Sequence, residues 1–385
     1  MPEPYDPKPE SAARVAERVE NFNYDLPEEL IAQEPPAERG TSRMLMMDRA
    51  TGVFRDDSFS RFGEYLREGD LLVLNDSRVI PARLYAHRTL RREKEKPTGR
   101  IEVMLTEPAG DSRWRALVRP GRKVAIGERL VFPAPDGRIV LEAEVLERGQ
   151  YGERLLEFAP VDDFFAALDS IGHIPLPPYI HRDDAAADRD RYQTVFARER
   201  GSVAAPTAGL HFTPDVLVQL SSKGIEITRV TLHVGLGTFA PLRVEHVDEV
   251  RLHRERYTVG DAAAESINRA LADHRRIVAV GTTVVRTLEA AALNSQDRVS
   301  TGVISPHSGV TDIFISPGFN FRIAGALLTN FHLPQSSLLM LVSAFAGPEG
   351  TSPDRTGLER VLAAYRHAIS ERYRFFSYGD CMFIQ

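Results

Sequence analysis

Short apolar segments at regular spacing mark the stretch from Asp70 to about Pro160. They are rich in leucine, β-branched and aromatic residues, and they are separated by the Gly, Pro and Asp residues typical of turns. No segment here repeats its apolar residues at the spacing of an amphipathic helix. The pattern predicts a small all-β barrel, with strands near residues 71–74, 101–105, 114–118, 129–132, 139–146 and 155–158.

The pattern changes after residue 160, where apolar residues begin to recur at helical spacing. Thr213 followed by Pro214 predicts the N-cap and the first residue of a helix, and Gly224 is placed to end that helix. The β-branched run at residues 225–234 then predicts a buried strand.

The same alternation of helix and strand continues toward the C-terminus. Asp261 is expected to cap a helix that runs to Arg275, and residues 277–280 are expected to form the next strand. Thr282 or Thr283 then opens a further helix. Strands that alternate with helices predict parallel pairing, so we expect an α/β main domain with a mixed, partly parallel sheet.

Together these patterns predict an α/β main domain into which the small all-β barrel is inserted. The four early prolines and the Ala/Arg/Glu-rich run after them indicate a flexible leader before the first domain. We expect a leader at residues 1–20, the α/β catalytic domain at residues 21–71 and 159–385, and the barrel at residues 72–158.

Composition narrows the class of protein. The 385 residues are 43% hydrophobic and 26% charged, which is ordinary for a globular chain, and the formal charge of −6 argues against a protein that coats nucleic acid non-specifically. The single cysteine, Cys381, fits a reducing compartment. The N-terminus lacks the pattern of a secretory signal, and the apolar stretch at residues 338–347 is too short to cross a bilayer. We expect a soluble cytoplasmic protein with no membrane association.

A first candidate motif covers residues 205–212 and ends directly before the capped helix. Thr207 and Gly209 are small enough for the backbone to approach a ligand, and His211 can exchange protons near neutral pH. From the spacing alone, a structural turn with a packed histidine is the favoured explanation of the segment.

A second motif, at residues 232–239, places Gly235 and Gly237 after a strand and resembles a dinucleotide or methyltransferase fingerprint. That fingerprint needs a helix to open at the glycines, whereas Pro241 and a β-like stretch follow here. The segment is interpreted as a loop next to a ligand, with a bulged strand end as the alternative.

A third motif, at residues 280–286, combines a strand end, Gly281 and a helix start. The helix N-terminus offers free backbone N–H groups, and Arg286 follows one turn later, so Thr282, Thr283 and Arg286 suit an anionic group. Ordinary threonine capping with a surface arginine is the alternative.

A fourth motif, at residues 329–337, carries Asn330 and His332 between a strand and an apolar helix. An α/β fold exposes side chains to a ligand at such a position, although the segment is also a valid capping loop.

Arg78 and Arg83 stand in a segment that can present two cations to RNA, with surface ion pairs as the commoner explanation. The histidines show no spacing typical of a zinc motif, so we expect no metal.

These motifs, with the lead-in at residues 192–195 and the segments at 308–315 and 373–380, resemble the S-adenosylmethionine:tRNA ribosyltransferase-isomerase family, which acts in queuosine biosynthesis. The resemblance covers residues 22–384. It implies that S-adenosylmethionine serves as a co-substrate, whose pentose is attached to an aminomethyl-deazaguanine base at the tRNA wobble position. Epoxyqueuosine in tRNA results, with adenine and methionine released.

The resemblance also implies roles for residues. It assigns proton transfer to His211 or His332, and it makes Asp312 a polar partner at the purine or ribose. Co-substrate contacts fall to Thr207, Gly209, Gly235, Gly237, Gly281, Thr282, Thr283, Arg286 and Asn330. RNA contacts fall to Arg78, Arg83, Tyr192 and Gln193, and a base is expected to stack on Phe212, Phe239 or Phe331.

Two other functions remain as alternatives at this point. One is an S-adenosylmethionine-dependent tRNA methyltransferase, against which the context of the second motif counts. The other is a non-catalytic RNA-binding protein, for which a basic, aromatic surface would be more typical. A monomer is expected for each of the three functions.

Overall fold

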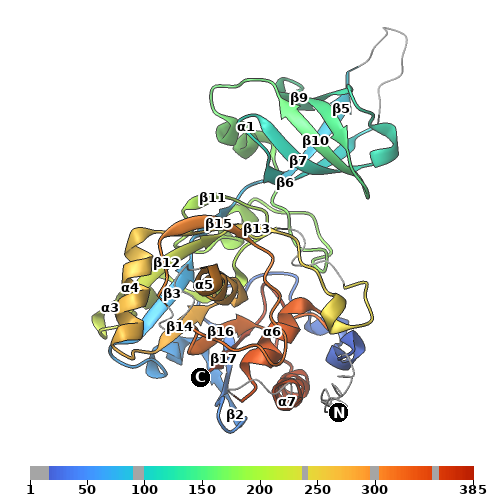
Figure 1. Ribbon diagram of the computed structural model, residues 1–385. Helices are drawn as coiled ribbons and strands as arrows, with labels where there is room; N and C mark the ends of the chain where they lie inside the picture. The colour runs from blue at the N-terminus through green and yellow to red at the C-terminus, as the bar shows by residue number, and fades with distance from the viewer. Residues whose placement is uncertain (1–16, 90–98, 236–241, 295–302, 349–354) are drawn as a thin grey trace, which may run out of the picture.

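A computed structural model describes residues 17–89, 99–235, 242–294, 303–348 and 355–385. It contains a large α/β unit and, above it in Figure 1, a separate small barrel. The prediction of an α/β domain with an inserted all-β barrel is therefore confirmed. Across the described ranges, no helix is long and apolar enough to cross a membrane.

The α/β unit is built on a nine-stranded mixed sheet. Strands β12, β3, β14 and β16 pair in parallel at its centre. On one side β13 and β15 are added antiparallel. On the other side β17 pairs antiparallel with β16, β1 pairs parallel with β17, and β2 pairs antiparallel with β1. The strand order is β15 (His307–Thr311), β13 (Glu255–Val259), β12 (Glu226–Leu232), β3 (Leu71–Asn75), β14 (Ile277–Val280), β16 (Ala326–Asn330), β17 (Cys381–Ile384), β1 (Arg43–Met47) and β2 (Phe54–Ser58).

Helices cover both faces of this sheet. Successive side chains of β3 point to opposite faces, so Leu71 and Val73 pack in the core formed with α4 to α7, whereas Leu72 and Leu74 pack with Leu220 of α3. The α-helices are α1 (Phe164–Ile171), α2 (Asp188–Arg191), α3 (Pro214–Ser222), α4 (Asp261–Ala272), α5 (Thr282–Asn294), α6 (Ser337–Phe345) and α7 (Thr356–Ser370).

The predicted helix limits are largely confirmed. The Thr213 hydroxyl caps α3 by accepting the Val216 N–H at 3.2 Å, and Gly224 follows the helix with φ of +81°. The prediction that Asp261 caps α4 is wrong, because the N-cap is Gly260 and Asp261 is the first helical residue. An acidic residue is favourable there too, since it faces the positive end of the helix dipole.

Six antiparallel strands close the barrel in the order β10-β7-β6-β5-β8-β9, and α1 packs its Leu168 into the barrel core. The strands are β5 (Arg83–Arg88), β6 (Ile101–Pro108), β7 (Arg113–Arg119), β8 (Arg129–Pro133), β9 (Ile139–Arg148) and β10 (Glu153–Phe158). A two-stranded parallel sheet of β4 (Ser77–Val79) and β11 (Glu199–Ser202) lies where the chain passes between the two units.

The prediction that residues 71–74 form a barrel strand is wrong, because these residues belong to β3 in the centre of the large sheet. All five residues of β3 are buried, whereas barrel strands such as β7 alternate buried and exposed residues. A continuous apolar run is typical of a parallel strand that is covered on both faces, and this difference from its neighbours was the available signal.

The 3-10 helices are η1 (Val19–Phe22), η2 (Glu28–Leu30), η3 (Phe59–Glu64), η4 (Gly121–Lys123), η5 (Thr207–His211) and η7 (Val247–Glu249). Of these, η5 carries the first candidate motif into the α/β unit.

Candidate active site

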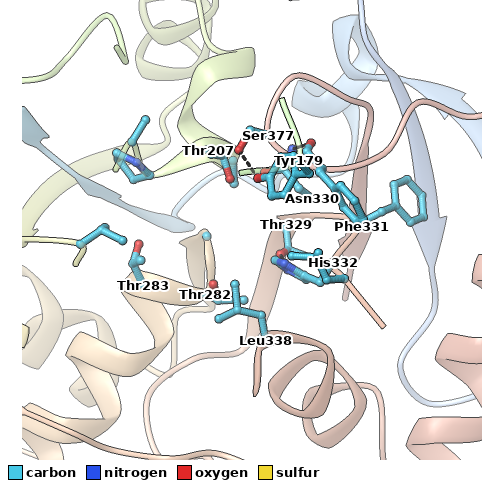
Figure 2. A pocket seen from close by; sticks show the side chains of 17 residues that line it. Tyr179, Thr207, Thr282, Thr283, Thr329, Asn330, Phe331, His332, Leu338 and Ser377 are labelled. Carbon is cyan, nitrogen blue, oxygen red and sulfur yellow. Dashed lines mark hydrogen bonds between the residues drawn. The ribbon is translucent and has the colours of Figure 1, made fainter. Parts of the chain in front are cut away.

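A pocket opens where the neighbouring parallel strands β14 and β16 end (Figure 2). Ligands of open α/β sheets bind outside the carboxyl ends of such strands. The space between its walls, open solvent included, is about 550 Å³. Its polar walls come from five separate segments, which contribute Tyr179, Thr207, Thr282, Thr283, Thr329, Asn330, His332 and Ser377.

The turn from β14 to α5 forms one wall. Gly281 has φ of +95°, a left-handed conformation that favours glycine, and it lets the chain enter α5 directly from the strand. Thr282 and Thr283 begin the helix and line the pocket, so the first backbone N–H groups of α5 lie at its edge. The Asn75 amide at the end of β3 donates to the Thr283 hydroxyl at 3.3 Å and fixes that side chain.

His332 lies in the wall formed by the segment after β16. Its Nε2 is 2.8 Å from the Thr329 hydroxyl, and its backbone N–H donates to the Tyr365 hydroxyl at 3.0 Å. Burial lowers the pKa of His332 to about 3. The imidazole is therefore neutral at physiological pH and keeps one unprotonated ring nitrogen.

His211 is close to the pocket without lining it. Its Nε2 lies 3.3 Å from the Asn330 amide nitrogen, and its Nδ1 lies 2.9 Å from the Ser42 hydroxyl. Burial, followed by the nearby Arg39 charge, lowers the pKa of His211 to about 4. The ring thus stands behind Asn330, and the ring of His332, not His211, faces the cavity.

The wall that carries Tyr179 and Ser377 was not identified from the sequence. The two hydroxyl oxygens are 2.6 Å apart, as the dashed line in Figure 2 marks. Burial raises the pKa of Tyr179, so the phenol stays protonated. Tyr179 follows a proline-rich run at residues 175–178, and no spacing along the chain connects it with Ser377.

The residues of the first motif have different roles, some at the pocket and some in packing. Thr207 lines the pocket, whereas Gly209 is buried against other side chains. A Cβ at Gly209 would lie 2.8 Å from atoms of both Phe196 and Thr194, which explains the glycine by close packing. The assignment of Gly209 to a ligand contact therefore loses its support.

Glu255 connects the second and third motifs, because it forms a buried ion pair with Arg286 and also binds the backbone of Gly235. The Arg286 guanidinium contacts the Glu255 carboxylate, both side chains are 5% exposed, and Glu255 also accepts the Gly235 N–H at 3.0 Å. Glu255 already compensates the Arg286 charge, and Arg286 does not line the pocket. Gly237 and Phe239 lie outside the described residues.

Other predicted contacts are separated from the pocket. Asp312 is exposed just after β15 and is not among the lining residues. The prediction that a base stacks on Phe212 is wrong, because this ring is fully buried among Phe59, Phe62 and Phe196. Phe331 does contribute to the pocket wall.

The predicted RNA residues fall into two groups. Arg78 is exposed, and Arg83 is partly buried with its Nε 3.6 Å from Glu102. The predictions for Tyr192 and Gln193 are wrong, because Tyr192 is fully buried and the Gln193 amide bonds both the N–H and the carbonyl of Val79. Gln193 thus holds β4, and Tyr192 packs against Tyr378 in the core of the α/β unit.

Within the described residues, no group of three or more His, Cys, Asp or Glu side chains is placed to hold a metal ion. The expectation of metal-free chemistry stays a prediction that requires a chelation experiment.

Comparisons with known proteins agree with this geometry. A relative from Solibacter usitatus (strain Ellin6076), called S-adenosylmethionine:tRNA ribosyltransferase-isomerase, is 53% identical over 378 residues, covering 95% of this chain and 99% of the relative. A relative of the same name from Natranaerobius thermophilus is 44% identical over 369 residues, with 96% and 99% covered. The crystal structure of S-adenosylmethionine tRNA ribosyltransferase from Thermotoga maritima superposes with a TM-score of 0.51 at 38% identity, covering 95% of this chain and 100% of that one. The model of the family described as queuosine biosynthesis protein matches residues 19–384, and the chain therefore belongs to this family.

Proposed function

We propose that this protein is an S-adenosylmethionine:tRNA ribosyltransferase-isomerase. It transfers and isomerises the ribosyl group of S-adenosylmethionine onto the aminomethyl-deazaguanine base at the tRNA wobble position. The products are epoxyqueuosine in tRNA, adenine and methionine. The observation that carries the proposal is the pocket at the ends of β14 and β16, which joins a helix N-terminus and a neutral histidine in a chain of this family.

The chemistry asks for three protein functions: removal of the proton beside the sulfonium, support of the departing adenine, and a site for the methionyl carboxylate. His332 is our choice for the proton, because its ring lines the cavity and is neutral. The N-terminus of α5, with Thr282 and Thr283, suits the carboxylate, because free N–H groups and the helix dipole attract an anion. Tyr179 offers a protonated hydroxyl on the opposite wall.

Neither alternative function is favoured. In the sequence, Pro241 and a β-like stretch follow the glycines of the second motif, whereas a methyltransferase fingerprint requires a helix there. For a non-catalytic RNA-binding protein, a buried pocket that gathers His332, Asn330 and a helix N-terminus would have no use.

One assay separates the three functions. The protein is incubated with tRNA that carries the deazaguanine precursor and with S-adenosylmethionine labelled either in the pentose or in the methyl group. A ribosyltransferase moves pentose label into tRNA and leaves methyl label in free methionine, because the sulfur departs with its methyl group attached. Methyl label in tRNA would indicate a methyltransferase, and retention of tRNA without transfer of either label would indicate a binding protein.

The same assay tests the remaining parts of the proposal. We expect one free adenine for each pentose transferred, and equal rates with and without a chelator. Activity that disappears on chelation would overturn the metal-free mechanism. We expect the active enzyme to be a cytoplasmic monomer, and sedimentation of the active protein tests its oligomeric state.

A further inference from the structure

The side-chain amide of Asn330 has one orientation that its surroundings allow. Its Nδ2 lies 3.3 Å from His211 Nε2, 3.3 Å from the Phe376 carbonyl oxygen and 3.5 Å from the Asp380 carbonyl oxygen. An amide turned by half a rotation would place its own oxygen against these two carbonyl oxygens, which repel it. These three acceptors therefore occupy the NH₂ group, and the amide oxygen lies on the other side of the side chain.

His211 reinforces this orientation. The neutral ring has one N–H and one lone pair, and the Ser42 hydroxyl at 2.9 Å from Nδ1 can accept the N–H. The lone pair on Nε2 then accepts a hydrogen bond from Asn330. Because burial lowers its pKa to about 4, His211 does not become a cation that would compete for the amide oxygen near neutral pH.

The amide oxygen of Asn330 is consequently left without a donor. Asn330 is 2% exposed, and its Oδ1 has no hydrogen-bond partner among the described residues. A buried acceptor without a donor is unfavourable, so nearly all such groups in native proteins have a partner. Since Asn330 lines the pocket, a ligand that brings an N–H group can supply the missing donor.

The neighbouring strand indicates which N–H group this is. β14 and β16 are adjacent and parallel, with Val280 opposite Leu328, so the α5 N-terminus and Asn330 follow the ends of neighbouring strands. An α-amino acid carries a carboxylate and an ammonium group on the same carbon atom. A helix N-terminus beside a single amide oxygen matches that pair of groups in charge and in hydrogen bonding.

We infer that Asn330 Oδ1 accepts a hydrogen bond from the α-ammonium group of the methionyl part of S-adenosylmethionine, and that His211 is a positioning residue that holds the amide in place. This inference rests on the proposed function for the identity of the ligand. It reassigns His211, which the sequence suggested for proton transfer.

Calorimetric titration of the full chain tests the ammonium contact. The probes are S-adenosylmethionine, its analogue without the α-amino group, and its analogue without the purine 6-amino group. The variants are Asn330→Ala and the control Asn268→Ala, since the Asn268 amide bonds the Ile304 backbone on both sides and lies outside the pocket. We expect Asn330→Ala to lower the affinity for S-adenosylmethionine roughly 10- to 100-fold, which is the effect expected for the loss of a hydrogen bond to a charged group.

The analogues identify the donor. The analogue without the α-amino group should bind the wild type and Asn330→Ala with similar affinity, and the purine analogue should still lose affinity in the variant. The ammonium contact is refuted if Asn330→Ala weakens the binding of the analogue without the α-amino group as strongly as that of S-adenosylmethionine. It is also refuted if the analogue without the purine 6-amino group is the one ligand that binds the wild type and the variant equally well. An unchanged affinity for S-adenosylmethionine in Asn330→Ala refutes it as well.

The positioning role of His211 has a separate readout. We expect His211→Ala to raise the KM for S-adenosylmethionine with a smaller change in kcat, and to add little to the loss of affinity in Asn330→Ala. A large fall in kcat with unchanged affinity would overturn this role. If the wild type binds S-adenosylmethionine through Asn330 but transfers no pentose to tRNA, the proposed function fails while the contact stands.

Discussion

Glu255 and Arg286 form a buried ion pair that joins β13 to α5 in the α/β unit. The carboxylate also accepts the N–H of Gly235, so the pair fixes the end of the segment after β12. Two opposite charges that are both 5% exposed compensate each other, and removal of either takes away the opposite charge that compensates the other in a poorly solvated site.

We expect Arg286→Met to lower the free energy of unfolding by about 3 kcal/mol or more, because it leaves the Glu255 charge buried and unpaired. The double variant Glu255→Gln, Arg286→Met should recover part of this loss, and urea denaturation measures both. If Arg286 instead bound the co-substrate, the refolded double variant would lose its affinity for S-adenosylmethionine, whereas we expect that affinity to be largely kept.

His332→Gln should reduce turnover by about 100-fold or more, because it removes the neutral ring from the pocket wall and keeps a polar group beside Thr329. Single-turnover transfer of pentose label measures the chemical step directly. The control is His181→Gln at an exposed position, which should leave the rate unchanged. A rate for His332→Gln equal to that of the wild type would remove His332 from the mechanism.

Gly281→Ala should destabilise the protein by about 1 kcal/mol, because an L-residue at φ of +95° is strained even though there is room for a Cβ. The same strain should tilt the first turn of α5 and weaken S-adenosylmethionine binding. Gly99→Ala in the barrel, where no atom lies within 4 Å of the added Cβ, serves as the control. Thermal unfolding and calorimetry together would show whether the α5 turn is as sensitive as we predict.

The stability of the fold should fall as the pH is lowered from about 6.5. The pKa of His211 is lowered to about 4 and that of His332 to about 3, so between these values and 6.5 the unfolded chain binds more protons than the folded one. Each histidine should contribute a slope of about 1.4 kcal/mol per pH unit in this window. Gln at both positions should reduce this slope, and the remainder should include His233, whose pKa burial also lowers to about 4.

If the exposed Arg78 touches the RNA backbone, Arg78→Ala should weaken tRNA binding. The slope of log K against log salt concentration should then become smaller by about one, which corresponds to the loss of one phosphate contact. Arg61, which is exposed but pairs with Asp57 and Glu64, provides the matched control. Filter binding at several salt concentrations measures both variants. Equal slopes for wild type and Arg78→Ala would place Arg78 outside the RNA interface.

Local signals in the sequence were sufficient for much of the fold. Thr213, Pro214 and Gly224 act on the backbone within a few residues of themselves, and the structure has the helix that they predict. Alternating apolar residues likewise predicted most barrel strands. The strand at residues 71–74 was placed in the wrong unit, because strand partners are chosen over long sequence separations and only its continuous burial distinguished it.

The candidate site was predicted in part for the same reason. Gly281, Thr282 and His332 each follow a strand and Asn330 ends one, and the parallel pairing of β14 with β16 brings them to one pocket. Tyr192, Gln193 and Arg286 carry residue types that suit a ligand, but their partners are Tyr378, Val79 and Glu255. Whether a polar side chain bonds to another part of the protein or is free to bind a ligand depends on its neighbours in space, which local spacing does not reveal.

The sequence by itself determined the family, the two units, and the strand ends where the polar residues gather. Only the tertiary structure decided which histidine faces the cavity, which arginine is compensated, and that Tyr179 and Ser377 share a wall. The physical reason is that capping, turns and periodicity act between near neighbours in the chain. Burial, desolvation and the orientation of an amide such as that of Asn330 depend instead on groups brought from distant segments, here His211, Phe376 and Asp380.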